Sequence, residues 1–118
     1  MNRDDVLGAC SALPQAKEDY PFGDDVAVFK IGAKMFALVM LTGDPGFVNL
    51  KCDPDWALRL RAQYPAVQPG YHANKRHWNS VTLDGTVDDT DLHDMIRHSY
   101  ELVVAGLSRA NRTRLFGT

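Results

Sequence analysis

The side chains best suited to chemistry gather in residues 69–81, Pro-Gly-Tyr-His-Ala-Asn-Lys-Arg-His-Trp-Asn-Ser-Val. This segment holds two cations, two imidazoles, two aromatic rings and two carboxamides. Lys75 and Arg76 suit phosphate, the lysine as a point charge and the arginine as a bidentate fork. Tyr71 and Trp78 offer faces for stacking, and the carboxamides can contact base edges or a sugar-phosphate backbone. The composition is typical of a surface that binds anions or nucleic acid.

The same segment also has a purely structural explanation. Trp78 would then fill the core, and Asn74 would adopt the left-handed conformation of a turn. Lys75 and Arg76 would form the solvated tip of a hairpin. The residues alone leave both explanations open.

Two kinds of chemistry receive little support. His72 and His77 on facing strands could meet around a metal, but no cysteine or carboxylate lies between them, so no native metal is expected. Ser80 is near His77 in sequence but falls on the opposite face of a strand, and no GxSxG motif surrounds it. Neither GxxxxGK[ST] nor GxGxxG occurs. We therefore expect a protein without catalytic activity or cofactor.

Apolar periodicity predicts the elements that position this segment. The fold class is α+β, with a mainly antiparallel sheet of about five strands and helices packed on it, in the order α-β-β-β-α-β-β-α. Helices are expected over residues 4–13, 53–65 and 88–107. Strands are expected over residues 26–31, 35–41 and 47–52, and on both sides of a basic tip at residues 73–76.

The strand predicted over residues 35–41 is apolar on both faces. Simple alternation places Met35, Ala37, Val39 and Leu41 on one face, and Phe36, Leu38 and Met40 on the other. Such a strand is central in a sheet or is covered on both sides.

Capping residues mark where two helices begin. Asp53 precedes Pro54 as an N-cap before a first-turn proline, and Asp88 can cap the long helix. The long helix has an apolar stripe that is expected to lie on the sheet, formed by Leu92, Met95, Ile96, Tyr100, Val103 and Leu107. Ser108 could cap one final short turn that carries Arg109, Arg112 and Arg114.

Length and composition indicate one ordinary domain over residues 1–118, with 45% apolar and 24% charged residues. The longest apolar run, residues 35–41, is too short to cross a bilayer, so no membrane association is expected. The first residues lack the apolar run of a secretory signal, which favours a cytoplasmic location with Cys10 and Cys52 as reduced thiols. The net charge of −2 argues against binding nucleic acid by bulk attraction.

Several motifs together resemble the MmcQ/YjbR family. They are the segment 69–81, Leu-Asp-Gly at 83–85, Ser-Tyr-Glu-Leu-Val at 99–103, Lys-Cys-Asp-Pro at 51–54 and Pro-Phe-Gly at 21–23. The resemblance covers nearly the whole chain. It implies a compact α+β fold like that of the CyaY/frataxin group and a double-wing arrangement predicted to bind DNA. It names no catalytic residue, and the site that it implies consists of Tyr71, His72, Asn74, Lys75, Arg76, His77, Trp78 and Asn79.

Two functions are therefore expected from the sequence. In the first, the protein binds DNA, with the basic tip, Lys30 or Lys34, and the tail arginines on phosphates. In the second, the same hairpin is the wall of a small-ligand pocket or a docking surface for a protein, with Trp78 and His77 partly enclosed. A monomer or weak dimer fits both.

Overall fold

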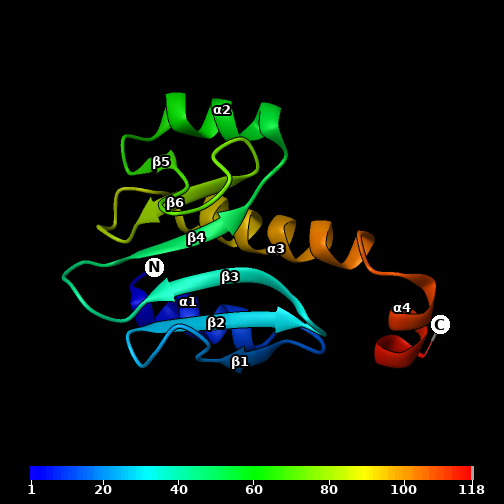
Figure 1. Ribbon diagram of the computed structural model, residues 1–118. Helices are drawn as coiled ribbons and strands as arrows, with labels where there is room; N and C mark the ends of the chain where they lie inside the picture. The colour runs from blue at the N-terminus through cyan, green and yellow to red at the C-terminus, as the bar shows by residue number, and fades with distance from the viewer. Residues whose placement is uncertain (118) are drawn as a thin grey trace.

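The computed structural model describes residues 1–117 and shows helices packed on one sheet (Figure 1). Thr118, the last residue of the domain expected over residues 1–118, lies outside the described residues. The helices are α1 (Arg3–Ser11), α2 (Pro54–Gln63), α3 (Asp89–Ala105) and α4 (Arg109–Phe116). The strands are β1 (Lys17–Asp19), β2 (Val26–Ile31), β3 (Lys34–Met40), β4 (Phe47–Lys51), β5 (Val67–Pro69) and β6 (Trp78–Thr82).

The sheet is antiparallel throughout, with the strand order β1-β2-β3-β4-β6-β5, which confirms the α+β class. It has six strands where about five were expected. The additional strand, β1, lies in a segment for which no element was predicted; all three of its side chains are exposed, so no apolar alternation marks it. The expected final turn after Ser108 is a complete helix, α4.

Helices α1 and α3 cover one face of the sheet and form the main core with it (Figure 1). The predicted stripe of α3 is confirmed, because Leu92, Met95, Ile96 and Val103 are buried there and Leu107 follows them. Helix α2 stands beside β5 and β6 at one end of the strand order. In Figure 1 no helix of residues 1–117 covers the face turned toward the viewer; we call it the open face.

A bulge in β3 decides which of its side chains reach the open face. Phe29 pairs with Ala37, whereas the next residue, Lys30, pairs with Met35, so Phe36 is an extra residue in β3. Phe36 is fully buried and packs edge-on against Tyr100, with ring centroids 5.5 Å apart. The expectation that Met35 shares a face with Ala37 was wrong, because the bulge reverses the alternation at Phe36.

Helix α2 is fixed at its N-terminus to α3. The Asp53 carboxylate accepts hydrogen bonds from the backbone N–H groups of Asp55 and Trp56, at 3.1 and 3.2 Å, which confirms the predicted cap. The Asp53 N–H donates to Nε2 of His98 at 3.0 Å, and the Trp56 ring meets the His98 ring edge-on. His98 must therefore be neutral at Nε2 to accept this bond.

This contact makes stability depend on pH. Desolvation lowers the pKa of His98 below its ordinary value. The negative charges of Asp53 and Glu101 act in the other direction but are smaller effects. The unfolded chain then binds more protons below about pH 6.5, so the free energy of unfolding falls as the pH decreases through that range. We expect urea denaturation to show lower stability at about pH 5.5 than at about pH 7.5, and a smaller difference in His98→Gln. An equal difference in the variant would assign the pH dependence to other groups.

Candidate functional site

The loop between β5 and β6, residues 70–77, is held against the open face by two side chains of the sheet. The Asn49 amide donates to the carbonyl of Tyr71 at 2.9 Å, and the Tyr71 N–H donates to the Ser80 hydroxyl at 2.8 Å. The Ser80 hydroxyl in turn donates to Asn49 Oδ1. Asn49 and Ser80 are both buried, so these bonds fix the backbone of the β5–β6 loop in a place that water barely reaches.

Gly70 brings the start of this loop close to β6. Its N–H donates to the carbonyl of Trp78 at 2.8 Å. A Cβ atom at Gly70 would lie 2.7 Å from Cβ of Trp78 and 2.9 Å from its carbonyl oxygen, closer than atoms can approach. Glycine is therefore required here to allow the contact.

Adding a methyl group at Gly70 should consequently destabilise the protein. We expect Gly70→Ala to lower the free energy of unfolding by about 1–3 kcal/mol, as overpacking typically does. Gly8→Ala in α1 is the matched control: its Cβ would meet nothing within 4 Å, and alanine should stabilise a helix by about 0.5–1 kcal/mol. Urea denaturation measures both, and equal stability of the two variants would refute the close approach.

Arg61 ties the far side of the loop to α2. Its Nε donates to Asn79 Oδ1 at 2.7 Å, and its Nη2 donates to the carbonyl of Lys75. Asn79 is only 2% exposed. The side chain of this residue, which the family resemblance places in the site, is therefore a buried link between β6 and α2.

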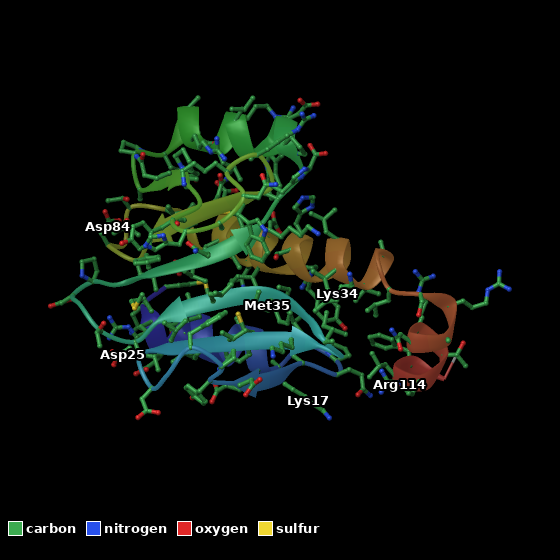
Figure 2. The ribbon with its side chains drawn as sticks, in the orientation of Figure 1. Lys17, Asp25, Lys34, Met35, Asp84 and Arg114 are labelled. Carbon is green, nitrogen blue, oxygen red and sulfur yellow. The ribbon has the colours of Figure 1, made fainter. Side chains whose placement is uncertain are left out.

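A pocket of about 420 Å³ lies on the open face, between the sheet and the β5–β6 loop. Its floor comes from β2, β3, β4 and β6, and Tyr71 packs edge-on against Phe47 at its side, with ring centroids 5.8 Å apart. Figure 2 labels Met35 at the centre of this face. The lining residues are Phe22, Val26, Met35, Leu38, Met40, Phe47, Asn49, Tyr71, His72, Ala73, Asn74 and Trp78.

The structure divides the expected site residues into separate groups. Tyr71, His72, Asn74 and Trp78 line the pocket, whereas the half-buried His77 does not, contrary to the expectation that it shares an enclosure with Trp78. The remaining three residues, Lys75, Arg76 and Asn79, lie outside the pocket lining.

The two cations of the loop are exposed. Lys75 Nζ donates to the carbonyl of Gly70 at 3.2 Å. Within residues 1–117 the ion pairs are Lys30 with Asp19 and the N-terminal amine with Asp89, so Lys75 and Arg76 form none. Of Lys30 and Lys34, either of which was expected to contact phosphate, Lys30 is thus already paired.

The sequence did not predict the apolar floor of the pocket. Its central residues are Met35, Leu38, Met40 and Phe47. The signal was present in the strand that is apolar on both faces, because helices cover only one face of this sheet. An apolar face without a covering element indicates a binding surface.

Both cysteine thiols are buried and unreactive. Burial raises the pKa of the Cys10 thiol to about 12 and that of Cys52 to about 11, so both thiols stay protonated at neutral pH. Among residues 1–117, no three His, Cys, Asp or Glu side chains lie together in a way that could hold a metal ion. No helix in the same part of the chain is long and apolar enough to span a membrane.

Comparisons with known proteins agree on one family. The model of the family described as YjbR matches residues 11–102. The chain is 43% identical over 104 residues to "Uncharacterized protein YbdF" of Escherichia coli O157:H7, covering 87% of this chain and 84% of that protein. It is 31% identical over 115 residues to "Uncharacterized protein YjbR" of Escherichia coli K12, covering 98% of each.

Solved structures of similar proteins share the fold. A crystal structure of the Deinococcus radiodurans protein DR2400, with a DUF419 domain, superposes with a TM-score of 0.89 at 42% identity, covering 97% of this chain and 87% of that one. A crystal structure of a Pseudomonas syringae protein superposes with a TM-score of 0.74 at 31% identity, covering 86% and 98% of the two chains.

Proposed function

The chain belongs to the YjbR family, and from the geometry of its pocket we propose that it binds a small, mainly apolar organic molecule on the open face of the sheet. The single observation that carries this proposal is the apolar pocket of about 420 Å³ beneath the β5–β6 loop. Sites for small ligands are typically concave, largely apolar and supplied with a few polar groups. His72 and Asn74 supply such groups at the rim.

The lining suits a ligand of adaptable shape. Met35 and Met40 are flexible and polarizable, and they can repack around different apolar bodies. Trp78 and Phe47 add larger surfaces, and Trp78 is only half-buried. By contrast, the Asn49–Ser80 pair and Gly70 hold the loop in place, so much of the site is formed before binding.

Tryptophan fluorescence tests this proposal at the site itself. The chain has two tryptophans, so a Trp56→Phe variant reports on Trp78 alone. We expect the neutral dye N-phenyl-1-naphthylamine to gain fluorescence and to quench Trp78 along one saturable curve. The Trp78→Phe variant, which replaces a lining residue, should bind the dye more weakly. Absence of saturable dye binding, or an unaltered dye affinity in Trp78→Phe, would refute a ligand site in this pocket.

DNA binding is the second candidate function, in line with the double-wing arrangement that the family resemblance implies. It is favoured by the exposure of Lys75 and Arg76 without carboxylate partners in the described chain, next to Tyr71, which is 57% exposed. Exposed cations bind phosphate, and an exposed aromatic ring can stack on a base.

Salt dependence tests the second candidate. If DNA is bound, Lys75→Ala with Arg76→Ala should reduce the slope of log affinity against log salt by about two units. Lys17→Ala with Arg97→Ala removes two exposed cations outside the β5–β6 loop and should leave the slope unchanged. A slope near zero in the unaltered protein would reject DNA as the partner.

A further inference from the structure

Charge is distributed unequally between the two ends of the open face. In Figure 2, Asp25 and Asp84 are labelled at one end of the sheet and Lys34 at the other. Because the strands are antiparallel, their directions show which other charged residues lie at each end of the sheet. The end that holds Asp25 also holds Asp24 and Asp44, and the end that holds Lys34 also holds Lys51, Lys75 and Arg76.

Lys51 connects the basic end to the pocket. It pairs across the strands with Trp78, a lining residue, and it follows Asn49 on the same face of β4. Side chains of directly paired residues are neighbours on one face of a sheet. Lys51 is half-buried and forms no ion pair within residues 1–117. A positive charge therefore stands where the apolar floor ends at Trp78.

Nearby charges do not cancel this asymmetry. At the basic end, the carboxylates of Asp53 and Asp55 lie at the N-terminus of α2, and the four cations Lys34, Lys51, Lys75 and Arg76 outnumber them. At the acidic end, the Arg3 guanidinium donates hydrogen bonds to the carbonyls of Thr42 and Gly43, so one positive charge lies near this end. Arg3 belongs to α1, on the face that the helices cover. The open face thus keeps a positive end.

The polar rim also favours an anion at this end. Asn74 Oδ1 accepts the N–H of Arg76, so the Asn74 carboxamide is left with its NH₂ group as a donor. The Arg76 side chain is exposed beside it. Carboxylates and phosphates accept hydrogen bonds from such groups, and bonds that involve a charge are the strong ones.

We infer that the ligand of this pocket is an amphipathic anion, whose apolar body lies along Met35, Leu38 and Met40 and whose acidic group lies at the Lys51 end. This inference rests on the proposed small-ligand function and adds the charge and orientation of the ligand. A carboxylate at the opposite end would meet the field of Asp24 and Asp25.

Three probes with the same chain length separate the charge from the apolar body: octanoate, octanol and octyltrimethylammonium. Affinities are measured from Trp78 emission in the Trp56→Phe background. We expect octanoate to bind about tenfold more tightly than octanol, as a charge-assisted hydrogen bond allows, and the cation to bind most weakly. In Lys51→Gln with Arg76→Gln, octanoate should lose this advantage while octanol keeps its affinity.

Lys17→Gln with Arg97→Gln is the matched control, because it removes the same charge at exposed positions outside the pocket. It should keep the preference for octanoate. Equal binding of octanoate and octanol, or a preference for the cation, would overturn the anionic assignment and leave the apolar pocket intact. If none of the three probes binds, the proposed small-ligand function itself fails.

Discussion

Replacing Leu38 with glutamate is expected to weaken binding of N-phenyl-1-naphthylamine about 100-fold or more, close to 2.7 kcal/mol. Leu38 lies on the pocket floor, between Val28 and Asn49 of the adjacent strands. In the empty protein a carboxylate at this position remains partly hydrated. A bound apolar molecule would remove that water without offering a hydrogen bond, which is costly for a charged group.

Leu58→Glu makes the same chemical change outside the pocket. Leu58 is 61% exposed on α2. This variant should bind the dye as the unaltered protein does. Circular dichroism and urea denaturation are used to check that both variants are folded. Equal affinities of the two folded variants would show that the dye binds elsewhere.

Replacing Asn49 with leucine should give the largest loss of stability among the loop contacts. The change leaves the Tyr71 carbonyl and the Ser80 hydroxyl without their partner. Each buried polar group left unsatisfied costs about 1–3 kcal/mol, and we expect a total of about 2–4 kcal/mol. Because the same bonds position the loop, dye affinity should fall as well. Urea denaturation and the dye titration measure the two effects.

Asn111→Leu provides the comparison for this change. Asn111 is exposed on α4, where its Oδ1 accepts a bond from Arg114. Exposed substitutions usually change stability by less than about 0.5 kcal/mol. If Asn49→Leu is as mild as Asn111→Leu, the Asn49–Ser80 pair does not hold the loop.

The sequence predicts best those features that depend on neighbouring residues. The caps at Asp53 and Asp88 and the buried stripe of α3 are confirmed, because capping and helical periodicity are local. The bulge at Phe36 was not predicted, because it exists only in the pairing of β3 with β2. Strand β1 was missed for a related reason, since backbone pairing rather than side-chain burial forms it.

The candidate site is predictable only in part, because it also depends on which distant strands pair with one another. Composition singled out the β5–β6 loop, and Tyr71, His72 and Trp78 do line the pocket. However, the floor is assembled from β2, β3, β4 and β6, and only the sheet order brings them together. Asn79, which the resemblance places in the site, has a side chain that faces α2.

Methionine methyl NMR tests the central claim most directly. The chain has four methionines, of which Met35 and Met40 line the pocket, Met95 is buried in the core and Met1 lies at the N-terminus. On titration of methyl-labelled protein with N-phenyl-1-naphthylamine, we expect the Met35 and Met40 signals to shift along one saturable curve, with those of Met1 and Met95 nearly unmoved. Stationary Met35 and Met40 signals, or equal shifts of all four, would contradict a ligand site on the open face.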